Sequence, residues 1–197
     1  MNVIALAILV TIFLIQVSAI KTRASYFLKS GFFGSLIFMA AIFLIFGFAA
    51  HQSWQTYILW EKSEVAKMLL PPYKNLDYFI FYSRNRFFVP YFLSLSVGLL
   101  FLIGAQLINK KYQERFFERI EPYLLATVLF VVGHPLWLFY LVILLAANFL
   151  FSIFYFLFSK KKDYRLSFYY FWLSAGIFTI LISKWLSALP WWTLLKL

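Results

Sequence analysis

Three glutamates stand at helical spacing just ahead of an apolar run in the middle of the chain. Glu114, Glu118 and Glu121 are four and three residues apart, so a helix places them on one face. Ionisable groups that enter membrane helices are usually functional, which makes Glu118 and Glu121 candidate catalytic or coupling carboxylates. A simpler interpretation is that Glu121, followed by Pro122, starts a helix. An anion there gains about 0.3–1 kcal/mol from exposed N–H groups.

Histidine offers a second kind of chemistry, metal binding. The chain has two histidines, His51 and His134, and both fall at the same predicted membrane boundary. With Glu61, Glu64 or Asp77 they could hold a metal ion, but no spacing motif supports such a site. We therefore expect interfacial histidines, with no metal and no cofactor.

Other reaction classes lack their usual residues. The absence of cysteine excludes disulfides, thiol nucleophiles and cysteine metal sites. The sequence also has no Walker loop, no dinucleotide-binding glycine pattern and no HExxH motif, which argues against an ATPase or a zinc protease.

The composition indicates a membrane protein. The chain is 64% hydrophobic, with a mean hydropathy of +0.84, whereas soluble domains are closer to half apolar. The net charge of +11 comes from short basic clusters between apolar runs, as in loops that face the cytoplasm and anionic headgroups. We expect the partners to be the lipid bilayer and a membrane protein or a second copy of the chain, and not nucleic acid.

The apolar runs predict a single all-α domain, a bundle of about six transmembrane helices. About 20 apolar residues cross a hydrocarbon core of roughly 30 Å. The predicted spans are residues 2–20, 31–50, 90–108, 113–133, 136–158 and 167–189. The fourth span has a difficulty, because Pro122 to Val132 makes only about 16 Å of helix. Either the helix begins near Gln113, or Pro122 starts a half-length helix.

The positions of the basic clusters predict an orientation in the plasma or inner membrane. Positive loops face the cytoplasm, which leaves both termini and residues 51–89 outside. The 51–89 segment mixes aromatic and charged residues and is divided by Pro71-Pro72. It predicts two short interfacial helices, either a docking surface or lid over the bundle or simply an aromatic belt.

Two features predict contacts between helices. Asn148 lies within the fifth span, where an amide usually bonds a neighbouring helix. Small residues every four positions form a ridge on the sixth span, which favours close packing within the chain or between chains. The ridge consists of Ala175, Thr179, Ser183 and Ser187.

The stretch from Glu121 to Lys184, roughly a third of the chain, resembles the C-terminal half of the prepilin peptidases, which are membrane aspartyl proteases. "EPYLLATVLFVVGHPLW" aligns Glu121 with a family aspartate and Gly133 with a turn, and "SKKKDYRLSFYYFWLSAGIF" matches a basic loop and final span. The resemblance implies an intramembrane peptidase. The catalytic motifs are not retained, because Ser83 occupies the second aspartate position and falls on the opposite membrane face. A dyad needs both carboxyls on one side.

Three functions remain open on this evidence. The leading hypothesis is a non-catalytic scaffold or assembly partner in a membrane complex. The first alternative is a divergent or degenerate peptidase centred on Glu121. The second is a small transporter subunit with a polar path from Glu118 and Glu121 to Asn148. The surroundings of Glu121 distinguish them: a second carboxylate favours the peptidase, a polar path favours the transporter, and a solvated position favours the scaffold.

Overall fold

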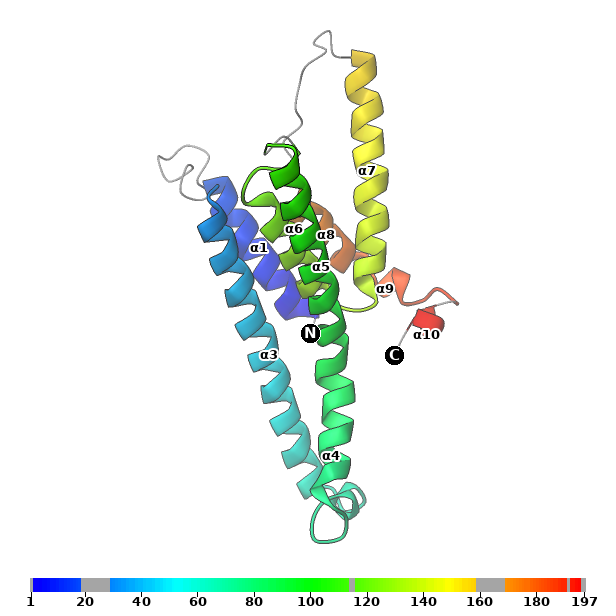
Figure 1. Cartoon of the computed structure of the whole chain (residues 1–197). Helices are drawn as coiled ribbons and strands as arrows, with labels where there is room; N and C mark the ends of the chain where they lie inside the picture. The colour runs from blue at the N-terminus through cyan, green and yellow to red at the C-terminus, as the bar shows by residue number, and fades with distance from the viewer. Residues whose placement is uncertain (1, 19–28, 114–115, 159–168, 191, 196–197) are drawn as a thin grey trace.

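The computed structural model describes residues 2–18, 29–113, 116–158, 169–190 and 192–195 (Figure 1). These residues form helices and connecting turns without any strand, which confirms the all-α prediction for the described part of the chain. The elements are α1 Asn2–Ser18, α3 Gly31–Lys62, η2 Ala66–Leu69, α4 Leu76–Ser83, η3 Arg84–Phe88, α5 Val89–Lys111, α6 Glu121–Val132, α7 Leu136–Phe158, α8 Phe171–Leu181, α9 Ser183–Leu186 and α10 Trp192–Leu195.

Three helices among the described residues are long and apolar enough to cross a membrane. They are Gly31–Lys62, Leu76–Lys111 and Leu136–Phe154, and they support the prediction of a membrane protein. The six predicted full spans are not all present at full length. Helix α1 has 17 residues, α6 has 12 and α8 has 11, and an isolated helix needs about 20.

The helices nevertheless alternate in direction between two ends of the molecule. At the basic end, Lys29 before α3 pairs with Glu118 before α6. At the opposite end, which we call the hairpin end because α3 and α5 are joined on that side, Asn2 of α1 donates a hydrogen bond to Ser183 at the start of α9. Figure 1 accordingly shows α1, α5 and α7 running from the hairpin end to the basic end, and α3, α6 and α8 running back.

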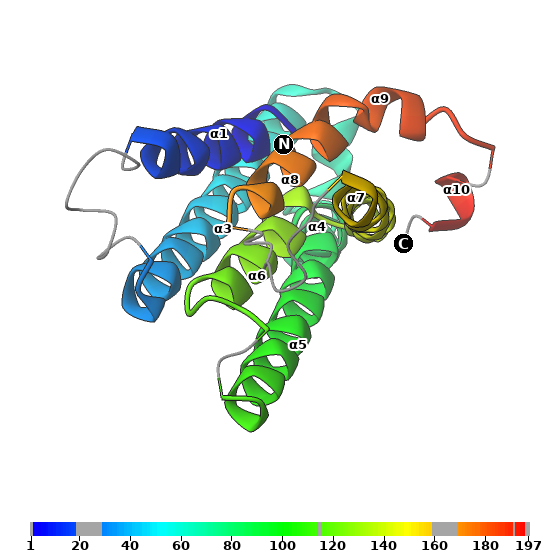
Figure 2. The same cartoon turned by 90° about the horizontal axis from the view of Figure 1, so that it is seen from above.

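Helix α6 is the centre of the bundle. It contacts α1, α3, α5, α7 and α8, and Figure 2 shows it enclosed by these helices. Eleven of its 12 residues are buried. Phe130 packs edge-on against Phe38, with 6.4 Å between ring centroids, and also contacts Phe46 and Tyr91. A helix that is apolar on all sides is expected to be buried in this way.

The half-length alternative for the fourth span is the one observed, and a helix start near Gln113 is wrong. The side chain of Asn109, near the end of α5, forms two hydrogen bonds with the turn that follows. Its Nδ2 donates to the Phe117 carbonyl at 2.9 Å, and its Oδ1 accepts from the Phe117 N–H at 3.1 Å. Helix α6 then begins at Glu121 and ends at Gly133, whose φ of +77° favours glycine.

The break expected at residue 50 is also absent. Helix α3 continues to Lys62, and Leu76 to Lys111 is one helical run through α4, η3 and α5. Residues 51–89 are therefore mainly the end of a long α3–α5 hairpin, here called the hairpin tip, which extends beyond the bundle in Figure 1. Short helical elements do lie on either side of Pro71-Pro72, namely η2 and α4.

Candidate functional site

Glu121 is buried at the basic end of α6. Its side chain is 1% exposed, so it is not on a solvated edge. It is the first residue of α6, after the N-cap Ile120, and its carboxylate accepts a hydrogen bond from the Glu118 N–H at 3.1 Å. This bond satisfies a backbone donor in the preceding turn, which is a structural use of the carboxylate.

Glu118 forms an ion pair across the bundle. Its carboxylate lies 3.2 Å from Lys29 Nζ, and the two side chains are 26% and 42% exposed. Lys29 Nζ also lies 5.3 Å from the ring centroid of Tyr169, which precedes α8. The cluster therefore links α3, α6 and α8 at the basic end.

The residues aligned with the two peptidase aspartates are far apart. Ser83 hydrogen-bonds to Ser53 on α3. The α6 end near Glu121 instead packs beside Gly34, where an added Cβ would lie 2.9 Å from Tyr123 Cβ. Gly34 and Ser53 are separated by about 28 Å along α3 at 1.5 Å per residue. Ser83 and Glu121 are thus on different levels of the molecule, and this geometry does not bring them together as a pair.

The two histidines lie in different surroundings. His51 is exposed on α3, with its Nε2 3.4 Å from Gln55 Nε2. His134 follows α6, and its Nε2–H donates to the Leu195 carbonyl at 2.7 Å. Among the residues that the structure describes, no three His, Cys, Asp or Glu side chains form a group that could hold a metal ion.

Most of the small-residue ridge is used inside the chain. Ala175, Thr179 and Ser183 are buried, whereas Ser187 is exposed. Helix α8 packs on α1 and α6, and the neighbouring Gly176 has no room for a side chain, because an added Cβ would lie 2.5 Å from Val128 Cγ1. This ridge therefore brings α8 close to the central helix.

Asn148 has no such neighbour. It is half-buried on α7 and forms no hydrogen bond with any residue in the described part of the chain. It lines neither the pocket at the hairpin end nor the pocket near Pro122. The predicted polar path from Glu121 to Asn148 therefore has no counterpart in these two pockets.

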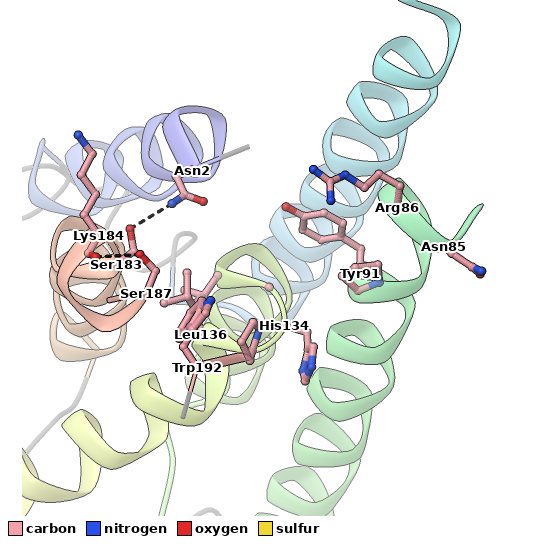
Figure 3. A pocket seen from close by; sticks show the side chains of 14 residues that line it. Asn2, Asn85, Arg86, Tyr91, His134, Leu136, Ser183, Lys184, Ser187 and Trp192 are labelled. Carbon is pink, nitrogen blue, oxygen red and sulfur yellow. Dashed lines mark hydrogen bonds between the residues drawn. The ribbon is translucent and has the colours of Figure 1, made fainter. Parts of the chain in front are cut away.

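The pocket at the hairpin end has a volume of about 480 Å³ and is lined by both polar and apolar residues. Figure 3 shows Arg86 and Tyr91 on one side of it and Asn2, Ser183 and Lys184 on the other. His134, Ser187 and Trp192 also contribute to its lining. Part of the lining comes from α1, η3 and α5, and the rest comes from α9, α10 and the turns after α6 and α9. The pocket therefore lies between the N-terminal and the C-terminal parts of the chain.

Sequence reasoning did not identify this pocket or the contacts that enclose α6. Asn2 and Ser183 are 181 positions apart, and no local pattern relates them. The sequence analysis did not identify Asn109, whose side chain bonds the Phe117 backbone. Three glycines on three different helices, Gly34, Gly98 and Gly176, lie close to α6. Because they are far apart in the sequence, no local pattern showed that all three pack against the same helix.

Comparisons of the chain with protein-family models, with curated proteins and with solved structures find no match.

Proposed function

We propose that the protein is a non-catalytic scaffold of a membrane complex and that the hairpin tip is its docking surface. The observation that carries this proposal is the length of the hairpin. Helix α3 has 32 residues, or about 48 Å of helix, compared with a hydrocarbon core of roughly 30 Å. The hairpin tip therefore has enough length to stand clear of the membrane and reach a partner.

The surface of the hairpin tip suits a protein partner. Large apolar side chains are exposed there, including Trp54, Ile80 and Phe81. The hairpin tip also carries exposed charged residues, such as Glu61 and Lys62. Apolar anchors within a polar rim are typical of protein interfaces.

The hairpin tip is also held in one shape by its own aromatic contacts. Phe79 packs edge-on against Tyr57 and Trp60, with centroid separations of 5.2 and 5.3 Å. Trp60 also contacts Tyr82 at 4.9 Å. A preorganised surface loses less entropy on binding, which supports a docking role.

Helix α7 offers a second contact surface inside the membrane. It is the least buried of the three long apolar helices, and it carries Asn148. Amides within membrane helices commonly bond a neighbouring helix, for roughly 0.6–2 kcal/mol. Because the ridge on α8 is used within the chain, α7 replaces it as the proposed membrane contact, with a partner protein or with a second copy.

Glu121 is buried, so the solvated position expected for a scaffold is not observed. The use of both glutamates in structural contacts nevertheless supports this proposal over the peptidase and transporter alternatives. Glu118 pairs with Lys29, and Glu121 accepts from a backbone N–H. A scaffold requires both glutamates only for folding.

The test compares two double variants that remove similar exposed apolar side chains. Ile80→Ala with Phe81→Ala alters the hairpin tip, and Leu100→Ala with Ile103→Ala alters the lipid-facing side of α5; all four residues are more than half exposed. We expect the tip variant to lose the native complex on a blue-native gel from mild detergent. The α5 variant should keep it.

Equal complex formation by both variants and the wild type would reject the docking role. Equal loss in both would indicate general damage to membrane packing. The unfolding temperature of each purified variant shows whether the fold is retained.

We further propose that the hairpin tip and both termini face the outside of a plasma or inner membrane. The basic end carries Lys29, Lys110 and Lys111, and positive loops favour the cytoplasm. Because the chain has no cysteine, single cysteines report orientation directly. Ser63→Cys should react with an impermeant thiol reagent in intact cells and Tyr112→Cys should not; the reverse pattern would invert the orientation.

A further inference from the structure

The pocket at the hairpin end has positive charge and hydrogen-bond donors but no acid. Arg86 and Lys184 contribute to its lining, and none of its described lining residues is Asp or Glu. Neither cation has an ion pair with any residue in the described part of the chain. A cation-lined pocket without carboxylates favours an anionic ligand.

Several donors in the pocket also lack an acceptor. Asn2 Nδ2 donates to Ser183 Oγ at 3.0 Å, so the Ser183 hydroxyl proton is available for another acceptor. The Trp192 side chain is 7% exposed, and its indole N–H has no acceptor among the described residues. A buried donor without an acceptor is unfavourable, and a bound anion would supply the missing acceptors.

His134 has one ring nitrogen that is free to bond a ligand. Its Nε2–H donates to the Leu195 carbonyl, while its Nδ1 is buried without a partner among the described residues. Neutral His134 accepts at Nδ1, and the protonated form donates there. It can therefore bond a protonated or an unprotonated oxygen.

We propose that this pocket binds a phosphate group, carried by an anionic phospholipid headgroup or by a soluble phosphate ester. Phosphate has several acceptor oxygens and can receive donors from different directions, and Arg86, Ser183 and Trp192 are donors from different sides of the pocket. The volume of about 480 Å³ lies in the usual range for small ligands. Arg86 also stands just before the apolar run of α5, where the sequence predicts the span 90–108 to begin.

The experiment measures binding to the purified full-length protein in neutral detergent. Phosphatidylglycerol is compared with phosphatidylcholine by native mass spectrometry, and glycerol 3-phosphate is titrated by microscale thermophoresis. We expect phosphatidylglycerol, glycerol 3-phosphate or both to bind, and phosphatidylcholine to bind more weakly. Binding of the lipid alone identifies a headgroup site, and binding of the soluble ester identifies a soluble ligand.

Matched variants connect the binding to the pocket. Arg86→Gln should weaken binding at least about tenfold, because it removes a charge-assisted contact. Arg84→Gln removes the same charge two residues away, outside the pocket, and should change binding little. Ser183→Ala should also weaken binding without changing the net charge.

Three results would overturn the proposal: no binding of either phosphate probe, equal weakening by Arg84→Gln and Arg86→Gln, or binding unaffected by both Arg86→Gln and Ser183→Ala. Each variant is first checked for an unchanged unfolding temperature without ligand. Ligand binding is measured on the purified protein, so its outcome is read separately from complex formation on the blue-native gel.

Discussion

Helices pack differently in the two parts of the molecule, the bundle that encloses α6 and the hairpin tip. In the bundle, small residues let helices approach α6 until it is enclosed; Gly98 is so close that an added Cβ would lie 3.0 Å from the Ala126 carbonyl oxygen. In the hairpin tip, the rings of Trp60 and Phe79 pack α3 against α4, and Figure 1 shows this end of the hairpin extending away from the other described helices of the bundle. Close approach to α6 therefore depends on small residues at particular positions, whereas the hairpin tip depends on aromatic rings packed between its two helices.

The largest difference between enclosed and open surfaces is expected on α5 itself. Ser94 and Ser96 both donate to the carbonyl four residues earlier, but Ser94 is 0% exposed and Ser96 is exposed. Ser94→Leu overfills the face that packs on α6 and should destabilise the fold by up to about 3 kcal/mol. Ser96→Leu should leave the unfolding temperature in detergent nearly unchanged, and equal losses would mean that α5 is not packed as described.

Apolar run length predicted α7 and the starts of α3 and α5 well, because long apolar runs identify membrane helices directly, but it did not predict that α3 continues past residue 50 to Lys62. It could not predict where α6 begins. That boundary depends on Asn109 bonding the Phe117 backbone, a contact between a helix and its own following turn. The sequence nevertheless contained the alternative that proved correct, since Pro122 favours a helix start.

The candidate site was less predictable than the fold. A helix start at Glu121 was one of two alternatives in the sequence, but the burial of Glu121 depends on the helices that enclose α6. The pocket at the hairpin end joins Asn2, Arg86 and Ser183, which only the tertiary fold brings together. Exposed charges such as Arg86 look alike in a sequence whether or not they line a pocket.

Glu121 gives the second largest expected effect, and it tests whether a buried carboxylate can be purely structural. Glu121→Leu leaves the Glu118 N–H without its acceptor and should lower stability by about 1–3 kcal/mol. Glu121→Gln keeps an acceptor oxygen, so it should lower stability less and leave the cellular role mostly intact. Complete loss of the cellular phenotype in a Glu121→Gln protein that folds and accumulates normally would instead support a peptidase or a transporter.

Two glycines of α3 test the same contrast with a single methyl group. At Gly34 an added Cβ would lie 2.9 Å from Tyr123 Cβ, whereas at Gly47 nothing lies within 4 Å. Gly34→Ala should lower the free energy of unfolding by about 1 kcal/mol, because the clash exceeds the gain in helix propensity. Gly47→Ala should be neutral or stabilising; a stabilising Gly34→Ala would show that α3 and α6 have room to separate.

The smallest expected effect lies at the border between the two kinds of surface. The Lys29–Glu118 pair joins α3 to the turn before α6, but both side chains are partly exposed, so the pair should contribute no more than about 1 kcal/mol. Lys29→Gln and Glu118→Gln should each lower the unfolding temperature slightly in low salt, and the difference from wild type should shrink at high salt because exposed charges are screened.

The double variant should lose less stability than the sum of the two single variants, since the same ion pair is removed in all three. A salt-independent loss as large as that of Glu121→Leu would mean that Glu118 acts through the buried core instead of through its ion pair.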